Sequence, residues 1–474
     1  MIGRLSGAID RREAAKKAVG AVFTVGGILL IGYILSSMII KLDVYFVIVV
    51  GIIVLVSIIL SRWFALGIVL FALIAPFNTG NSPAVLGAEA SYRAGVMPSQ
   101  LGLVFLCAFW GITRFFGSGI KLAKSRLNLP AAVFLGVAVA SMISSYFIWD
   151  DGVHRYDKQL LYQVSEIGIW ALCVAAFFLA ASSMKDKRWI GALYWPVAII
   201  GIYATFFQVT GLEWPWSITR STFITAFAAI LTTARVLFGK ESAGGKIGLA
   251  VLLGIFLLGS FWSRSWVSGW LTASLGITMV VLFYSRKMFA VTAVILLLAI
   301  AVQPAAMNTV YSESRSEGDM DRFDLWADAA KMASSVNPIL GIGPADYFAY
   351  SKKYGSVWYG NTTYTTAHSD YAQMIAELGL FGIAAFIWLV VAGIRTGIDT
   401  VRKGPKELKW LTVSATAIFA AIAITSLVGD YLLPSRVNGG IWSFSSSVFP
   451  WLLLGAAVAA AQPGEEDYGE EAEV

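Results

Sequence analysis

Stretches of about 20 consecutive apolar residues recur along this chain of 474 residues. A helix of that length crosses the hydrocarbon core of a bilayer and satisfies its own backbone hydrogen bonds there. Charged residues make up only 14% of the chain, whereas ordinary soluble domains carry about 25%. The sequence therefore predicts an all-α fold, a polytopic transmembrane helix bundle. It excludes a water-soluble globule, a disordered chain and a fibrous repeat.

Dividing the apolar runs at about 20 residues per crossing predicts about 14 spans, with 12 as the alternative count. The expected limits are 18–40, 44–60, 64–76, 99–117, 131–149, 160–182, 190–209, 222–238, 247–262, 269–284, 288–304, 373–394, 411–429 and 447–461. The first run is longer than a signal-peptide core, so we expect a retained span. The expected parts are an N-terminal bundle (1–304), a large outer-face loop (305–372), C-terminal transmembrane helices (373–461) and an acidic, disordered tail (462–474).

The placement of basic residues predicts the orientation. The net charge is +6, and most of the 35 lysines and arginines fall in alternate connections, such as KDKR at 185–188 and the loop at 395–409. Cytoplasmic loops carry this excess in bilayer proteins, so we expect both termini in the cytoplasm and the 305–372 loop on the outer face of the membrane. The positive charge is thereby assigned to topology, and no nucleic-acid partner is predicted.

The outer loop has internal order. Phe323, Trp326, Ala330 and Ala333 recur at helical spacing, which predicts a helix from 321 to 336. A long loop that contains short helices is expected to have a function. Asn337-Pro338 stops this helix, and the segment from Gly341 to Pro344 predicts a tight turn.

Two histidines lie on the predicted outer side, and His368 is the candidate catalytic residue. It stands just before a span, where a neutral imidazole can take a proton from a hydroxyl group near neutral pH. The alternative for His368 is an ordinary polar residue at the membrane interface. The same alternative applies to His154, whose case for a catalytic role is weaker.

Three outer arginines are candidate diphosphate ligands. Arg220 ends the loop before one span, Arg264 lies in a very short turn, and Arg322 begins the predicted loop helix. A guanidinium partly out of water can clamp a diphosphate through paired hydrogen bonds. Snorkelling to lipid headgroups is the alternative for each.

Carboxylates provide weaker candidates. Glu166 lies inside a span, where it either forms a structural salt bridge or lines an acceptor cavity. Asp319 and Asp321 form a D-x-D sequence that could hold a divalent metal, although the same acids suit a helix start. Cys107 and Cys173 lie in apolar runs and offer no metal-ligand spacing.

Taken together, these features resemble the O-antigen ligase and polymerase family (WaaL/Wzy-type). The family pattern has Arg and Trp on a helix, then Pro-x-x-Gly-x-Gly, then a His segment running into Glu-x-Gly-x-x-Gly. Those places are filled by Arg322, Trp326, Pro338, Gly341, Gly343, His368, Glu377, Gly379 and Gly382. RSTF at 220–223 and Ser263-Arg264 resemble two upstream landmarks. The family frequently has Asn after the histidine, whereas this chain has Ser369, so what orients the base stays open.

The resemblance implies a membrane glycosyltransferase of lipopolysaccharide or other polysaccharide biosynthesis. Its donor would be a glycan on undecaprenyl diphosphate, and its acceptor a hydroxyl of a lipid or glycan at the outer face. His368 would be the base, and Arg220, Arg264 and Arg322 would bind the diphosphate without metal or other cofactor, giving inversion. Glu166, Asp370 and Glu377 would serve the acceptor or the structure.

Three alternatives remain. The first is a 14-span flippase or transporter of lipid-linked glycan. Transporters commonly have repeated halves and polar groups near the middle of the membrane, whereas this chain has no repeated halves and its candidate functional residues cluster at the outer face. The second is a metal-dependent glycosyltransferase that uses Asp319 and Asp321. The third is a structural partner in envelope assembly. Ligase and polymerase cannot be separated from the sequence, because both share donor and mechanism.

Overall fold

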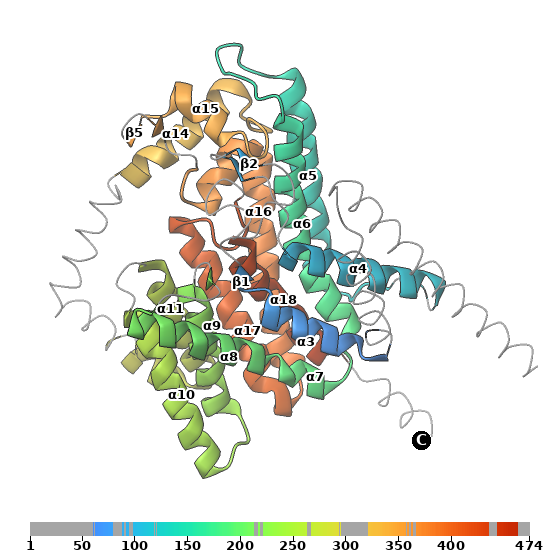
Figure 1. Cartoon of the computed structure of the whole chain (residues 1–474), viewed down its shortest axis with the longest axis vertical. Helices are drawn as coiled ribbons and strands as arrows, with labels where there is room; N and C mark the ends of the chain where they lie inside the picture. Colours follow the sequence, from blue (N-terminus) through green and yellow to red (C-terminus); the bar gives the residue numbers. More distant parts are fainter. Residues whose placement is uncertain are drawn as a thin grey trace, which may run out of the picture.

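The fold was examined in a computed structural model of the whole chain (Figure 1). The structure describes residues 60, 62–78, 88–89, 92–93, 98–117, 119, 121–212, 217–218, 221–262, 267–292, 294, 321–356, 358–359, 362–363, 366–435 and 443–462. These residues are helical apart from connections and three antiparallel pairs of two-residue strands, which confirms the all-α class. The pairs are β1 (Phe77–Asn78) with β4 (Ser217–Ile218), β2 (Ala88–Glu89) with β3 (Tyr92–Arg93), and β5 (Trp358–Tyr359) with β6 (Thr362–Thr363).

The helices of the first part of the chain are α3 (Phe64–Ile74), α4 (Pro98–Phe116), α5 (Asn128–Phe147), α6 (Gln159–Ser183), α7 (Lys187–Ala192), α8 (Tyr194–Thr210), α9 (Ser221–Phe238), α10 (Ala243–Trp262) and α11 (Val267–Tyr284). The later ones are α14 (Asp321–Val336), α15 (Tyr347–Tyr354), α16 (Asp370–Lys403), η1 (Lys406–Leu408), α17 (Lys409–Thr425), η2 (Ser426–Val428) and α18 (Phe444–Ala460).

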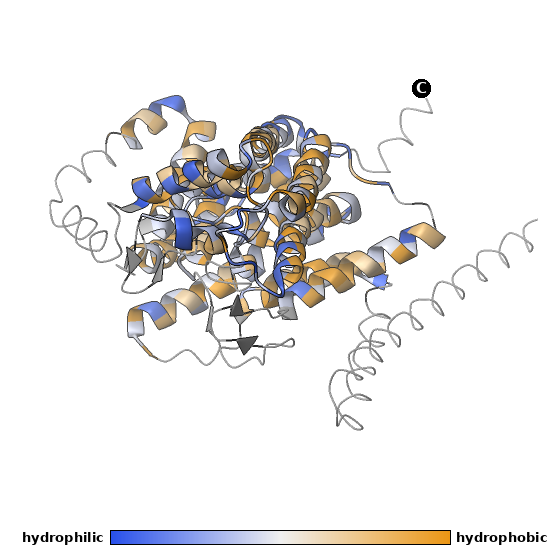
Figure 2. Ribbon diagram, turned by 90° about the horizontal axis from the view of Figure 1, so that it is seen from above, coloured by the Kyte–Doolittle hydropathy of each residue, from blue (hydrophilic) through white to orange (hydrophobic). Residues whose placement is uncertain are grey.

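Eight helical stretches of the described residues are long and apolar enough to cross a membrane, so the chain is a multi-pass membrane protein. They are Ser99–Phe116, Asn128–Phe147, Gln159–Ser183, Lys187–Thr210, Ser221–Phe238, Ala243–Phe261, Asp370–Lys403 and Lys406–Val428. Apolar residues dominate these helices (Figure 2). The predicted span 18–40 and most of the predicted spans 44–60 and 288–304 lie outside the described residues. At 1.5 Å per residue, the 11 residues of α3 are too few for the span predicted at 64–76.

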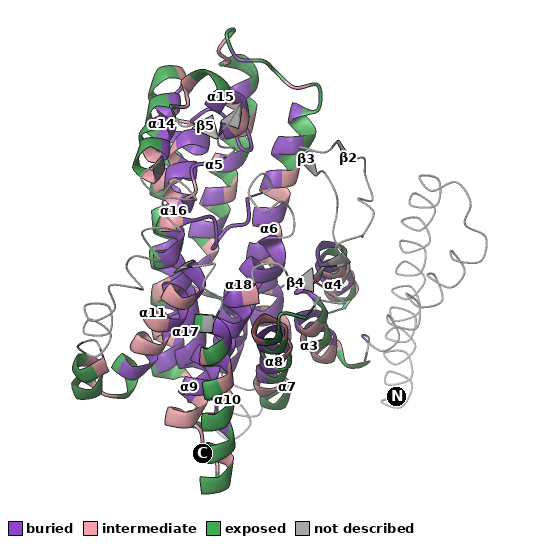
Figure 3. Ribbon diagram, turned by 60° about the vertical axis from the view of Figure 1, so that its left-hand side comes forward, coloured by how far each residue is buried: buried purple, intermediate pink, exposed green. Residues whose placement is uncertain are grey.

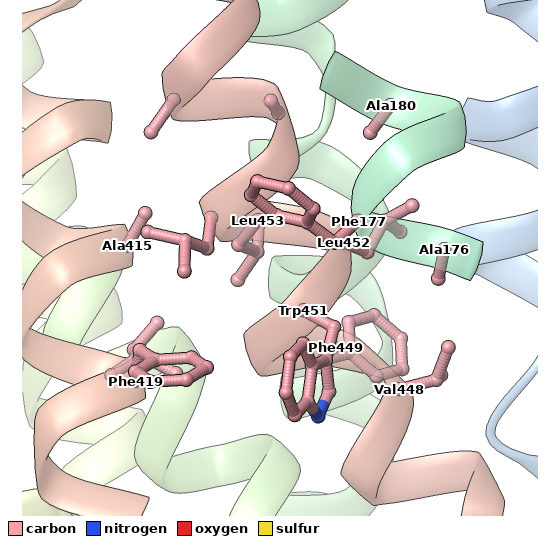
Figure 4. Packing of buried hydrophobic residues seen from close by; sticks show 14 of the residues in the cluster. Ala176, Phe177, Ala180, Ala415, Phe419, Val448, Phe449, Trp451, Leu452 and Leu453 are labelled. Atoms are coloured by element: carbon pink, nitrogen blue, oxygen red, sulfur yellow. The ribbon is translucent and has the colours of Figure 1, made fainter. Parts of the chain in front are cut away.

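The core extends through most of the bundle, and buried positions are most frequent on α9, α17 and α18, with α6 packed along α18 (Figure 3). Phe177 of α6, Phe419 of α17 and Trp451 of α18 are fully buried and point into one cluster (Figure 4). Gly455 lets α18 approach α6 closely, because a Cβ at this position would lie 2.3 Å from the carbonyl oxygen of Phe177. Small residues serve this purpose where membrane helices pack tightly.

Helix α16 is longer than the span predicted at 373–394. It continues to Lys403 and ends where Gly404-Pro405 stops it. Residues 395–403 are predicted to belong to a cytoplasmic loop because they are rich in charge, but they continue the helix. Arg126 Nε pairs with Asp399 Oδ2 at 2.6 Å and ties this extension to the chain before α5.

Residues 321–356 form a compact unit at one end of α5, α6 and α16, here named the α14–α15 unit (Figure 1). Helix α14 has the predicted bounds. Buried Met332 of α14 and buried Tyr347 and Tyr350 of α15 form a second apolar cluster with Val153 of the α5–α6 connection. The described part of the long loop is therefore a folded layer over the bundle.

Candidate functional site

His368 lies in the turn that starts α16, and its backbone is left-handed with φ +47°. Ala345 is the one further non-glycine residue with positive φ among the described residues. A side chain disfavours this conformation, and such residues are held by surrounding contacts and often belong to functional sites. His368 is half-buried, so part of the residue is accessible to solvent.

Ser369 is the N-cap of α16, because its side chain accepts a hydrogen bond from the N–H of Ala372 at 3.3 Å. Its hydroxyl also reaches the carbonyl oxygen of Ser426 at 3.5 Å. Ser and Asn are equally good N-caps. Ser369 can therefore replace asparagine without a change in the geometry of the helix start that carries His368.

Asp370 anchors the helix start to residues 426–435, here named the 426–435 segment. Its Oδ2 accepts hydrogen bonds from the backbone N–H groups of Tyr431, Leu432 and Leu433 at 3.3, 3.0 and 3.3 Å. Its own N–H donates to the carbonyl oxygen of Gly429 at 3.1 Å. The geometry therefore gives Asp370 a structural use.

Arg322 of α14 reaches the same segment. Its Nη1 donates to the carbonyl oxygen of Val428 at 2.6 Å. The 426–435 segment thus contacts both Arg322 and the His368 turn, although 46 positions separate these residues in the chain. Two predicted site residues are brought to one place by a stretch that the sequence did not single out.

Two further helices meet this segment at Tyr431. The ring centroids of Phe223 in α9 and Tyr431 are 4.7 Å apart. Oγ of Ser268 in α11 lies 2.6 Å from the hydroxyl oxygen of Tyr431. The starts of α9 and α11 are in close contact, since a Cβ at Gly269 would lie 2.5 Å from Cβ of Thr222. The candidates Arg220 and Arg264 lie outside the described residues, in the connections that precede these two helices.

Helix α16 is broken at Gly379, and the turn after α14 fills the break. The N–H groups of Ile342 and Gly343 donate to the carbonyl oxygens of Ala376 and Glu377 at 2.9 and 3.0 Å. On the other side, the N–H groups of Leu380 and Phe381 donate to the carbonyl oxygens of Pro338 and Ile339 at 2.9 and 3.1 Å. The backbone groups that the break exposes are thus paired within a membrane helix, as they must be.

The two glycine motifs of the sequence are the two halves of this interlock. Gly379 has φ +64° and ψ −158°, and a Cβ there would lie 2.5 Å from the carbonyl oxygen of Ile339. Gly341 has φ +73°, and its Cβ would lie 2.4 Å from the carbonyl carbon of Glu377. Only glycine suits both positions. Pro-x-x-Gly-x-Gly and Glu-x-Gly are read separately in the sequence, but they form one structure.

Glu377 and Glu166 lie together in the buried interior. Glu377 Oε1 accepts a hydrogen bond from Nε2 of Gln373 at 2.5 Å. Glu166 of α6 is buried and interacts electrostatically with Glu377. Glu377 is thus one electrostatic neighbour of Glu166, and the predicted salt bridge of Glu166 to an outer arginine stays a prediction.

Two acids hold the α14–α15 unit against α5 and α6. Oδ2 of Asp346 accepts from Nε2 of Gln159 at 2.9 Å and of Gln163 at 2.7 Å, while burial raises the pKa of Asp346 to about 7. Asp150 pairs with Lys353 at 2.5 Å and accepts from the Tyr354 hydroxyl, and these hydrogen bonds lower its pKa to about 2.

The other predicted candidates stand apart from this site. His154 is exposed in the α5–α6 connection, with its ring 5.5 Å from that of Tyr156. Asp321 is the first residue of α14, where an acid suits the helix dipole, and Asp319 lies outside the described residues. Within the described ranges, no three His, Cys, Asp or Glu side chains gather as ligands for a metal ion.

Residues 228–387 match a family described as O-antigen ligase. This region is about a third of the chain, and it runs from within α9 to within α16. It contains Arg322, His368 and both halves of the interlock at Gly379. No curated protein matches the chain.

Proposed function

Through residues 228–387 this chain belongs to the O-antigen ligase and polymerase family, and we propose that it transfers a glycan from undecaprenyl diphosphate to an acceptor hydroxyl. His368 is the general base of this reaction. The observation that carries the proposal is the left-handed turn at His368, which lies inside the matched region and contacts the same segment as Arg322.

The reaction balances without a further reactant. The acceptor oxygen forms a bond to the anomeric carbon, and the bond between that carbon and the diphosphate oxygen breaks. The electron pair leaves with the diphosphate, and the hydroxyl proton passes to the neutral imidazole of His368. This single displacement inverts the anomeric carbon. The diphosphate is already a good leaving group, so the protein needs to supply cationic donors in a partly dry site.

Arginines supply that charge. Arg322 is fixed by its bond to the Val428 carbonyl, and its planar guanidinium carries five N–H donors. Arg220 and Arg264 are assigned to the diphosphate by chain position, because the helices that follow them meet at Tyr431 of the 426–435 segment. Asp370 and Glu377 support the backbone around the base, and Glu166 is part of the same buried interior.

The proposed setting is the bacterial inner membrane, with both termini in the cytoplasm. The α14–α15 unit then faces outward, and His368 stands at the outer boundary of the membrane. The excess of Lys and Arg in the connections at the opposite side supports this orientation. A cysteine introduced at Asp157, in the exposed α5–α6 connection, should react with a membrane-impermeant maleimide in intact spheroplasts.

The proposal is tested in a deletion strain that carries plasmid-borne variants. His368→Ala should lower transfer by about 10³-fold, while His154→Ala, at the chain's other histidine, should restore wild-type surface glycan. Both proteins should insert and melt alike in detergent. Normal transfer by a folded His368→Ala protein would refute the base assignment.

The same strain separates ligase from polymerase. If it retains long polymer on undecaprenyl diphosphate and none on the final acceptor, the enzyme is a ligase. If it makes single repeats only, the enzyme is a polymerase. Transfer in EDTA tests the metal-dependent alternative, because loss in EDTA and recovery with manganese would favour the Asp319 and Asp321 site.

The break in α16 gives a specific reason to keep transport as a second candidate. Broken helices near the middle of the membrane hold substrates or ions in many transporters. Here, however, the carbonyls of Ala376 and Glu377 are paired with Ile342 and Gly343, which supports a structural break. Movement of lipid-linked glycan across vesicles, at unchanged chain length, would favour the transporter.

A further inference from the structure

We propose that Gln373 is a positioning residue that fixes the backbone orientation of His368. This inference rests on the proposed function, because it assigns Gln373 a role through the proposed base. Gln373 lies in the first turns of α16, and its side chain reaches back over the helix start. Its Oε1 accepts a hydrogen bond from the N–H of Ala367 at 3.0 Å. Ala367 is the residue immediately before His368.

The Ala367 N–H needs this acceptor. Ala367 is fully buried, and the described Thr366 and Gln373 beside it are also buried. A buried N–H without a partner is costly. Without the Gln373 oxygen, the chain around Ala367 would rotate to bring this N–H toward water or another acceptor. Such a rotation changes the dihedral angles of the next residue, His368, which is held in a disfavoured left-handed conformation.

The side chain at position 373 must be an amide, because it accepts one hydrogen bond and donates another. Its Nε2 donates to Oε1 of Glu377 at 2.5 Å. The backbone N–H of Ala367 can only donate, so Oε1 faces Ala367 and Nε2 faces Glu377. Glu377 is in turn held through its backbone, because its carbonyl oxygen accepts from the N–H of Gly343 at 3.0 Å and from the hydroxyl of Ser141 at 2.7 Å. The amide is thereby fixed at both ends, and the interlock at Gly379 is connected to the His368 turn.

The chain offers a spectroscopic readout of His368. It has two histidines, and His154 is exposed and outside the proposed machinery, so a His154→Gln protein has a single histidine. Diethyl pyrocarbonate reacts with neutral imidazole, and the ultraviolet absorbance of the product then reports on His368 alone. All variants below are made in this background, as full chains in nanodiscs.

Gln373→Met keeps the side-chain length but removes the acceptor and the donor. We expect about a 10²-fold lower rate of transfer from lipid-linked glycan extracted from the deletion strain, as misplacement of a catalytic group produces. We also expect faster modification of His368, because its turn is no longer held. An unchanged transfer rate, or a lower rate with unchanged modification of His368, overturns the proposal.

A swap of the two side chains tests the hydrogen-bond pattern itself. Gln373→Glu alone sets two carboxyl groups against each other, and we expect it to lose transfer as Gln373→Met does. Adding Glu377→Gln reverses the pair, so that an oxygen at position 373 again accepts from Ala367 while the amide at 377 donates. Transfer and the modification rate should return to within about threefold of the background protein. A folded double variant that remains as inactive as Gln373→Glu overturns the proposal.

The two levels of inference fail differently. If His368→Ala retains full transfer, the proposed function is wrong. If His368→Ala abolishes transfer but Gln373→Met transfers at the background rate, His368 remains the base and the positioning role of Gln373 is wrong.

Discussion

The interior formed by α6, α17 and α18 and the region around the α16 break are both buried, but different interactions hold them. The interior depends on apolar volume, with Phe177, Phe419 and Trp451 filling one cluster (Figure 4). The break depends on paired backbone groups and on Gly341 and Gly379, where φ is positive and a Cβ would collide with neighbouring backbone. Loss of volume should therefore weaken the whole bundle, whereas damage to the break should mainly impair the site.

The largest effect on stability is expected in the apolar interior. Phe419→Ala should lower the free energy of unfolding by about 3–5 kcal/mol, because a fully buried ring leaves a cavity. Transfer per folded molecule should stay close to wild type, since Phe419 lies in α17 away from the His368 turn. Thermal unfolding in detergent and the transfer rate measure the two quantities.

The matched control for this variant is Phe206→Ala, whose side chain is 52% exposed. It should change stability by well under 1 kcal/mol. If Phe419→Ala reduces transfer per folded molecule as strongly as it reduces stability, the two regions are not separable.

A smaller loss of stability with a larger loss of activity is expected at the break. Gly379→Ala forces a side chain into a conformation reserved for glycine and into the Ile339 carbonyl, at a cost of about 3 kcal/mol. The interlock should open, and transfer should fall by about 10²-fold because the His368 turn loses its support.

Gly136→Ala in α5 is the control, because nothing lies within 4 Å of a Cβ there. It should leave both stability and transfer unchanged. Wild-type transfer by Gly379→Ala would show that the interlock does not support the site.

The smallest effect is expected at Asp150, which joins the α5–α6 connection to α15. Its pKa of about 2 lies below the usual value of 3.8, because Lys353 and Tyr354 donate hydrogen bonds to it. The group therefore stabilises the fold above about pH 4, and this contribution is lost as pH falls toward 2. Asp150→Asn should lower the melting temperature slightly at neutral pH and remove this component of the acid dependence.

Asp157→Asn, at an exposed position of the same connection, is the control and should follow the wild-type profile. An Asp150→Asn protein whose stability declines over this pH range as wild type does would show that the pair with Lys353 contributes nothing.

Much of the fold follows from local sequence. The period of Phe323 and Trp326 predicted α14 with the bounds Asp321–Val336, and Asn337-Pro338 ended it as expected. The apolar runs predicted α5, α6, α9 and α17 within a few residues. The extension of α16 to Lys403 was missed, because apolar content marks the part of a helix inside a bilayer and not its continuation in water.

The candidate site was predictable as a set of residue types but not as an arrangement. His368, Arg322 and the glycine motifs were recognised, yet nothing in the sequence connects Gly341 to Gly379 or Gln373 to Ala367. The 426–435 segment gave no signal either, although Asp370 and Arg322 both bind its backbone. Backbone hydrogen bonds depend on main-chain groups that all residues share, so side-chain patterns do not reveal them.

The sequence alone determined that this chain is a multi-pass helical membrane protein, because apolar length and scarce charge leave a bilayer as its solvent. It also determined where the chain turns, through Pro, Gly and Asn at the ends of helices. Only the tertiary structure decided that a loop closes a broken helix and that His368 stands in a left-handed turn. Those features arise from contacts between distant segments, which form only after the helices have packed.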